Sequence, residues 1–408
     1  MSSIELQVFT ENPNEAAALR AYWALADDGE TWAQTVTAVR QEFGLTQREM
    51  QRVVQEGGMA VVNDIKCPDC GAPHEVTSRT NYSDVIRQGN IMCPECRAAA
   101  QEAREEAARQ LAEKRREALV EAFPVYTGQP IDAEALTLFE AVALHALFSD
   151  LAVEDAGLTT PTDIWPKERR WAPPSLRWDY ERRLLRPERG ALLAAHRDAP
   201  LDAFVWEDDG TATGSFYLGK VSYYLIGPEE DLRARVPGLL TRLNRIFREG
   251  PWPDIWFNQW RDMWEELALA HASAYLDMKL GEHHLEMKQG DGTRTALADT
   301  LATFSLGQVF NFIYRAAKDS AAYYQRGGVN KRQAANSTVS RISAAADRAR
   351  ASGWEIKSFG LPWNLPFSAI AETFFSKVMW QADMMQVPHQ EAHPPVHAWP
   401  VEAEGNPE

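Results

Sequence analysis

The chain contains four cysteines, and they fall into two Cys-x-x-Cys pairs. Cys67-Pro68-Asp69-Cys70 is the first pair, and Cys93-Pro94-Glu95-Cys96 follows after residues 71–92. A thiolate is a soft ligand, and two thiolates in one short turn can bind the same metal ion. Four of them suit tetrahedral Zn²⁺ and leave no coordination position open for catalysis. The spacing therefore predicts one structural zinc ion per chain, bound by Cys67, Cys70, Cys93 and Cys96.

This arrangement resembles the zinc-ribbon family, and the resemblance covers residues 66–97 only. It implies two metal-binding turns that short strands bring together, and residues 75–79 and 90–92 are the candidates for those strands. Two disulfides or four free thiols are the alternatives, and the expected cytoplasmic location makes disulfides the weaker one. His74 lies near the first pair and could replace a cysteine ligand, but a histidine in a loop is the simpler interpretation.

The composition is that of an ordinary globular protein. Of 408 residues, 45% are hydrophobic and 25% are charged, which allows two or three domains. No stretch approaches the roughly 20 apolar residues of a membrane span, and residues 1–20 lack the apolar run of a secretory signal. We therefore expect a cytoplasmic protein without a membrane partner. Arginine greatly outnumbers lysine, which indicates a GC-rich bacterial genome.

The pattern along the chain predicts a mainly α, multidomain protein. Residues 1–62 form a helix-turn-helix-like module of three helices, because Thr31 and Thr46 each begin a capping-box pattern around the turn at Gly44. The expected units that follow are a small zinc ribbon, a long linker helix, a large helical domain with one β-hairpin near 203–226, and a disordered tail, over residues 63–97, 98–124, 125–386 and 387–408. Long helices are expected over 136–147, 232–247, 254–280, 305–325, 331–351 and 368–385.

The formal net charge of −16 excludes general adhesion to nucleic acid, so any such site is a local patch. The third N-terminal helix offers Arg48, Gln51 and Arg52, which are suited to phosphates and base edges in a major groove. Residues 31–62 carry three arginines and three glutamates, so a module that packs on protein is the competing interpretation.

A helical hairpin over 305–351 is the second candidate surface. Residues 311–360 hold nine Lys or Arg and three acids, a net charge of +6. The cations expected to bind nucleic acid are Arg315, Lys318, Lys331, Arg332 and Arg341, with Tyr323 and Tyr324 available to stack on a base. A solvated basic face is the alternative. In residues 165–189, tryptophans alternate with arginines, and arginine stacking beside an acidic neighbour is the preferred explanation there.

No phosphate-binding loop, nucleophile motif or metalloprotease motif is present in the sequence. The spacing of Arg189 and His196 resembles that of some helical ribonucleases, and four acid-x-Lys matches resemble a nuclease pattern. Both patterns occur too close to the frequency expected by chance to indicate a nuclease. The helical spacing of Trp256, Trp260 and Trp264 indicates core, and the pattern at 282–286 is not read as a second metal site. The resulting prediction is a non-enzymatic nucleic-acid-binding protein, with DNA as the first choice. The first alternative is a zinc-stabilised protein adaptor, which binds a protein partner or self-associates through the linker helix. The second alternative is a metal-dependent nuclease or ribonuclease effector.

Overall fold

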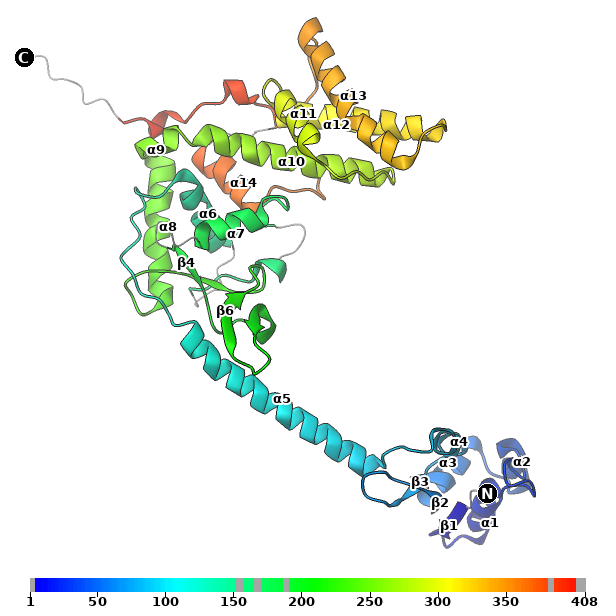
Figure 1. Ribbon diagram of the computed structural model, residues 1–408. Coiled ribbons are helices and arrows are strands. Elements are labelled where there is room, and N and C mark those ends of the chain that lie inside the picture. Colours follow the sequence, from blue (N-terminus) through cyan, green and yellow to red (C-terminus); the bar gives the residue numbers. More distant parts are fainter. Residues whose placement is uncertain (1–3, 151–156, 165–169, 186–190, 381–384, 401–408) are drawn as a thin grey trace, which may run out of the picture. The chain divides into compact units, whose positions relative to one another are not determined.

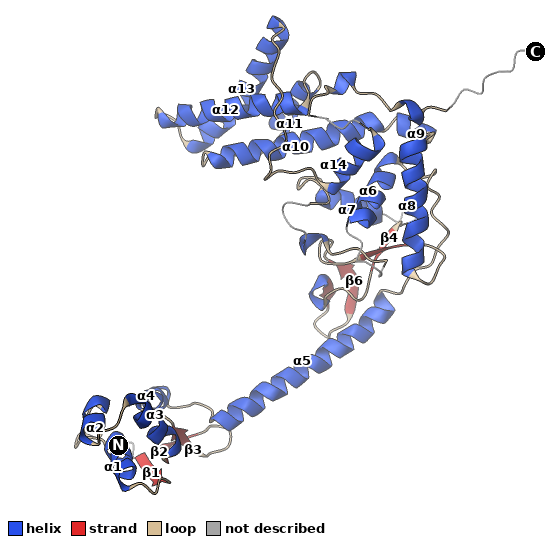
Figure 2. Cartoon of the chain, turned by 180° about the vertical axis from the view of Figure 1, so that it is seen from behind, coloured by secondary structure: helices blue, strands red, loops and turns tan. Residues whose placement is uncertain are grey.

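The computed structural model describes residues 4–150, 157–164, 170–185, 191–380 and 385–400. The chain divides into two compact units, Met1–Glu113 and Lys114–Glu408 (Figure 1). Helices dominate both units, and the strands are short and antiparallel (Figure 2). This confirms the predicted mainly α, multidomain class. Among the described residues, no helix combines the length and apolar character needed to cross a lipid bilayer.

The first unit is built on a three-stranded sheet of order β1-β2-β3. Its strands are β1 (Ile4–Val8), β2 (Gly58–Lys66) and β3 (Pro73–Val76). β1 pairs with β2 from Ile4 opposite Val62 to Val8 opposite Gly58. Alternate residues of β1 pack against the core, as the two-residue period of a strand requires. The helix-turn-helix-like segment and the cysteine segment therefore share one hydrophobic core, to which β2 contributes Ala60 and Val62.

Four short helices belong to this unit, and local caps explain where they begin. They are α1 (Pro13–Trp23), α2 (Val36–Glu42), α3 (Gln47–Glu56) and α4 (Arg79–Gln88). Three of them pack on the sheet, and α2 packs on α1. Thr46 forms the predicted capping box with Glu49. The capping box predicted at Thr31 is wrong, because Asp28 accepts hydrogen bonds from the backbone N–H and the hydroxyl of Thr31. The helix begins instead after Thr35, whose side chain accepts from the N–H of Ala38.

A buried arginine fixes the loop between α1 and α2. The guanidinium of Arg79 lies between the rings of Tyr22 and Trp32, 4.6 and 4.5 Å from their centroids. It donates to the carbonyl oxygens of Tyr22 and Gln34. These contacts attach the start of α4 to the end of α1 and to the loop that follows it. The chain then enters α5 (Pro94–Ala122), a helix of 29 residues that confirms the predicted linker helix.

The second unit begins with helices and short strand pairs. Its helices up to residue 257 are α6 (Leu138–Asp150), α7 (Arg177–Leu185), α8 (Leu232–Glu249) and α9 (Asp254–Phe257). The predicted β-hairpin is confirmed as β5 (Phe204–Trp206) with β6 (Ala212–Phe216), while β4 (Leu193–Ala195) pairs with β7 (Tyr223–Leu225). The long helix predicted over 254–280 is interrupted at Asn258, the C-cap of α9.

The helices that follow form the remaining layer of this unit: α10 (Trp260–Glu282), α11 (Asp291–Leu301), α12 (Leu306–Gln325) and α13 (Lys331–Ser352). α10 packs against α11 and α12, and α12 packs against α13. Gly327 and Gly328 have φ angles of 80° and 83°, which turn the chain between α12 and α13. Trp256, Trp260 and Trp264 are buried, as predicted.

The C-terminal region differs from two predictions. The helix predicted over 368–385 is a short α14 (Ala369–Glu372) continued by a π-helical turn, η4 (Thr373–Val378), and residues 381–384 lie outside the described part. Residues 387–400, predicted as part of a disordered tail, contain the turns η5 (His389–Glu391) and η6 (Val396–Ala398). Ala398 is buried in the core, and the N–H of Trp252 donates to its carbonyl oxygen.

Candidate metal centre

The first cysteine pair lies in the turn that joins β2 to β3. The N–H of Cys67 donates to Ala72, and the N–H of Gly71 donates back to Cys67, at 2.8 and 2.9 Å. Gly71 has a φ of 73°, a conformation that costs glycine little and most other residues much more. This closed turn places both thiols of the pair on the same side.

The second pair lies at the start of α5, and not on a strand. Residues 90–92, predicted as a strand, have no regular structure. Cys93 caps the helix: its carbonyl accepts from the N–H of Arg97, and its sulfur accepts from the N–H of Cys96 at 3.4 Å. Pro94, with no N–H to satisfy, occupies the first helical position. The positive end of the helix dipole thus faces two of the four sulfurs.

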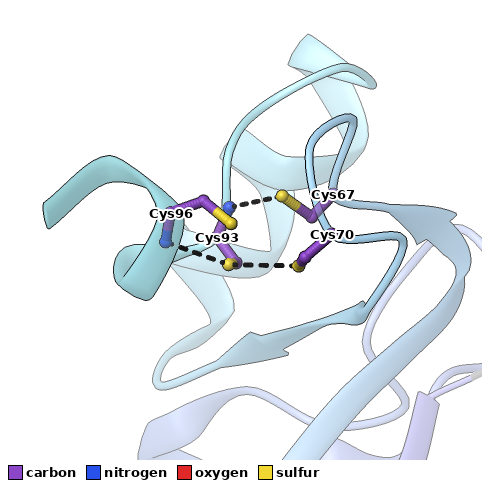
Figure 3. Close-up of side chains that lie close together, drawn as sticks. All are labelled: Cys67, Cys70, Cys93 and Cys96. Atoms are coloured by element: carbon purple, nitrogen blue, oxygen red, sulfur yellow. Dashed lines mark hydrogen bonds between the residues drawn. The ribbon is translucent and has the colours of Figure 1, made fainter. Parts of the chain in front are cut away.

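The four sulfur atoms form one cluster (Figure 3). All of them lie within 4.8 Å of one another, and the sulfurs of Cys70 and Cys93 are 3.7 Å apart. A Zn–S bond of about 2.3 Å places two sulfurs of a tetrahedron about 3.8 Å apart. A disulfide requires about 2.05 Å, and all four cysteines are free. The cluster therefore fits a four-coordinate metal ion.

Backbone N–H groups prepare this cluster for negative charge. The N–H groups of Cys70 and then Cys93 lower the pKa of Cys67 to about 6, and the donor of Cys93 lies 3.3 Å from that sulfur. The pKa of Cys96 is raised, chiefly by the hydrogen bond that it shares with the sulfur of Cys93. Sulfurs this close repel one another once several are ionised. A divalent cation removes that repulsion and replaces the thiol protons.

Neighbouring histidines and acids do not extend the site. His74 is buried on β3, opposite Val62, and is not part of the cluster. Within the described ranges, no other group of three or more His, Cys, Asp or Glu side chains is arranged to hold a metal ion. That result includes the residues at 282–286.

On α3, the side chains predicted to contact DNA are exposed to solvent. Arg48, Gln51 and Arg52 are all exposed. Arg52 forms an ion pair of 2.5 Å with Glu15 of α1, so part of the positive charge of this face is neutralised within the unit. Glu49 shares the same helix, and its carboxylate is engaged in the capping box.

The second candidate surface, the α12–α13 hairpin, keeps most of its predicted cations exposed: Arg315, Lys318, Lys331 and Arg332. Arg341 is half-buried and lies over the ring of Tyr323, 5.5 Å from its centroid, while Arg326 approaches the same ring at 6.0 Å. Of the two tyrosines predicted to stack on a base, Tyr324 is exposed. Asn311 of α12 is buried and donates to the carbonyl of Lys357.

The tryptophan–arginine segment lies partly outside the described residues, at 165–169 and 186–190. In its described part, Trp171 is buried, and Arg177 pairs with Asp163 and with the buried Glu181. Arg177 also lies over the ring of Trp178 at 4.4 Å. These contacts agree with the preferred explanation of arginine stacking beside acids.

Sequence reasoning did not consider a third cationic surface, on α8. Arg242, Arg245 and Arg248 recur every three residues and are exposed, while Leu239, Leu243 and other residues of the opposite face are buried. The three-residue spacing of these arginines within an amphipathic helix was the sequence pattern that could have indicated this surface.

No protein-family model matches the chain, and no curated protein or solved structure matches it.

Proposed function

We propose that the chain is a DNA-binding protein that contacts phosphates through the α12–α13 hairpin and holds a structural zinc ion in its cysteine cluster. The observation that carries the proposal is the exposed cationic surface of the hairpin. It belongs to a segment with a net charge of +6 in a chain of −16. Phosphate contacts supply most of the affinity of proteins for nucleic acid, so a local patch of this kind is sufficient for binding.

The tip of the hairpin supports this assignment. Lys331 and Arg332 begin α13, whose first N–H groups and positive dipole end favour an anion. Asn330 already caps one of these N–H groups through its side chain, so the cations contribute more than the helix end does. Tyr324 is exposed one turn before the tip and offers a face on which a base can stack.

Exposed aromatic side chains border the same segment. Tyr314 has 40% and Trp354 has 65% of its surface exposed. A solvated basic face gains nothing from aromatic rings in water, whereas a nucleic-acid surface gains stacking energy from them. The mixture of cations and exposed rings therefore favours binding over mere solvation. We assign α3 a secondary role, because Glu15 already occupies Arg52.

Zinc is the proposed metal because four thiolates at tetrahedral distances are a typical structural zinc site. With all four positions taken by sulfur, the ion stabilises the fold of the first unit and performs no chemistry. The cysteines are then structural ligands, and the DNA-binding residues lie elsewhere in the chain.

Charge reversal at the tip tests the DNA-binding proposal. Lys331→Glu combined with Arg332→Glu should weaken binding of a labelled DNA duplex, measured by fluorescence anisotropy, at least about tenfold at low salt. The salt dependence should flatten as well, since fewer counterions are released. The melting temperature should change little, because both side chains are exposed.

The matched control is Arg104→Glu with Arg109→Glu, an equal change of charge on the exposed face of α5. A loss of affinity as large in this control would assign the effect to overall charge and refute the hairpin. Unchanged affinity in the folded tip variant would do the same. Incubation of the same duplex with Mg²⁺ or Mn²⁺ tests the nuclease alternative directly, since cleavage would contradict a non-enzymatic role.

A further inference from the structure

The second unit contains a cavity of about 880 Å³ that neither the cysteine cluster nor the cationic hairpin uses. Its walls come from the start of α6, from α7, from the first half of α10, from α11 and from residues 387–389. Known small-molecule sites occupy about 300–1,000 Å³. The cavity is therefore large enough for an organic ligand.

Part of the lining of this cavity is apolar and belongs to the core. Met263, Trp264, Leu301, Phe304 and Leu306 line it, and all five are buried residues of the main hydrophobic cluster. Core packing fixes their positions, so this surface exists before any ligand arrives. It offers an aromatic and aliphatic contact area to the apolar part of a ligand.

Another part of the lining is acidic. Five carboxylates line the cavity, against the two guanidinium groups of Arg183 and Arg294: Glu140, Asp262, Glu265, Glu266 and Asp299. His389 also lines it, and burial lowers the pKa of this imidazole, which leaves it neutral at pH 7. The net charge of the lining is therefore −3.

Three of these carboxylates have partners within the protein. Glu266 accepts from the hydroxyl of Tyr180 at 2.8 Å and faces Arg183 at 3.6 Å. Glu140 accepts from the backbone N–H of Thr137 in a capping interaction. Glu265 lies 3.3 Å from the imidazole of His389.

Asp262 and Asp299 differ from these three. In the described part of the chain, neither carboxylate has a hydrogen-bonded or ion-paired side-chain partner; only the backbone carbonyl of Asp299 is used, by Arg350. Both residues are exposed, and both line the same cavity. They supply negative charge that is available to a ligand.

The arrangement discriminates between kinds of cation. Apart from the cysteine cluster, the described residues contain no three acids or histidines close enough together to coordinate one metal ion. The carboxylates are spread over α6, α10 and α11, and apolar residues share the lining with them. An extended cation with an apolar body satisfies both features, whereas a bare metal ion satisfies neither.

We propose that this cavity is a binding site for a small organic cation, in which an amine or amidine faces Asp262 and Asp299 while an aromatic or branched aliphatic body packs on Trp264 and Phe304. The polar groups select for charge, and the apolar wall supplies most of the buried area. The site is independent of DNA binding by the hairpin.

A series of aryl-alkyl amines of increasing size, each paired with its neutral alcohol, tests the proposal on the full-length zinc-loaded protein. Isothermal titration calorimetry should show saturable one-site binding of at least one amine, with its alcohol about tenfold weaker or worse. Asp262→Asn combined with Asp299→Asn should weaken the amine about tenfold and leave the alcohol unchanged. Glu134→Gln, an exposed carboxylate outside the cavity, should leave both unchanged.

Several results would overturn the assignment. Equal affinity for an amine and its alcohol would show that the carboxylates do not select for charge. Equal weakening by Glu134→Gln would show that only general surface charge acts. Failure of every amine in the series, or binding of a lysine-rich amphipathic peptide in their place, would show that the cavity does not take a small organic cation.

Discussion

Removing the first cysteine pair, by Cys67→Ser combined with Cys70→Ser, tests how far the metal supports the fold. Structural zinc contributes about 10–16 kcal/mol of apparent binding energy in zinc-finger peptides, where it is the main source of stability. Here the cysteines lie outside the hydrophobic cluster of the first unit. Tyr82 and Val85 anchor α4 in that cluster, and Val76 anchors β3.

These anchors limit how far the unfolding spreads. Burial of a large apolar side chain contributes about 1.5–3 kcal/mol, so Val76, Tyr82 and Val85 together hold β3 and α4 with roughly 5–9 kcal/mol as an upper estimate. Besides the sulfurs, the turn at 67–72 contributes no residue to this cluster, and the segment 89–93 contributes only the partly buried Ile91. Loss of the metal should therefore free these two segments and the first turn of α5, and leave β2 and α4 in place.

Hydrogen–deuterium exchange with mass spectrometry, on the full-length protein, resolves this pattern. Amides in 67–72 and 89–97 should exchange at least about tenfold faster in the double variant, while amides in 59–62 and 80–86 keep their protection. Elemental analysis should find about one zinc per chain in the wild type and in the control Glu95→Gln, which retains all four sulfurs, and none in the double variant. Unchanged exchange in the double variant would show that no metal supports these segments. Loss of protection across the whole first unit would show that the hydrophobic cluster does not hold β2 and α4 without the metal.

Two further predictions concern buried ionisable side chains, Arg79 and His271. Arg79→Met should destabilise the first unit by about 2–4 kcal/mol in urea unfolding, because the carbonyls of Tyr22 and Gln34 lose charged donors and Trp32 loses its stacked cation. Arg79→Lys should recover only part of this stability, and full recovery would contradict the planar stacking. Burial lowers the pKa of His271 to about 4, from 6.5, so the unfolded chain binds a proton between these values and the folded chain does not. Stability is then complete above pH 6.5 and falls with decreasing pH, by about 2.5 kcal/mol between pH 7.5 and 4.5. His271→Leu should remove that part of the pH dependence, and an identical pH dependence in the variant would show that the imidazole is not held neutral.

The sequence predicted local features well where neighbouring residues determine them. The capping boxes at Thr46 and Ser305 and the paired cysteines all depend on residues within a few positions of one another. The α12–α13 hairpin was predicted with its ends correct to one residue, since Gly327 and Gly328 break the helix and Asn330 caps the next one.

Features that depend on distant partners could not be read in the same way. The cap pattern at Thr31 failed for a local reason, since Asp28 uses its N–H and hydroxyl in a turn. By contrast, Trp32 is held by Arg79 from α4, and no pattern near Trp32 indicates this contact. β1 exists because β2, more than 50 residues later, supplies its hydrogen-bond partners. The same reason explains the cavity, whose lining comes from helices far apart in the sequence and follows no motif.

The position of the metal centre within the first unit indicates what the ion stabilises. Cys67 and Cys70 follow β2, Cys93 precedes α5 and Cys96 lies in its first turn, so an ion bound by all four would connect the sheet to the helix. Between Cys96 and the end of this unit at Glu113, no residue of α5 is buried. Core packing therefore does not hold this part of the helix against the sheet, and salt bridges such as Arg109–Glu106 lie within the helix itself. A metal ion bound by the four cysteines would supply the contact between this part of the helix and the sheet that core packing does not supply.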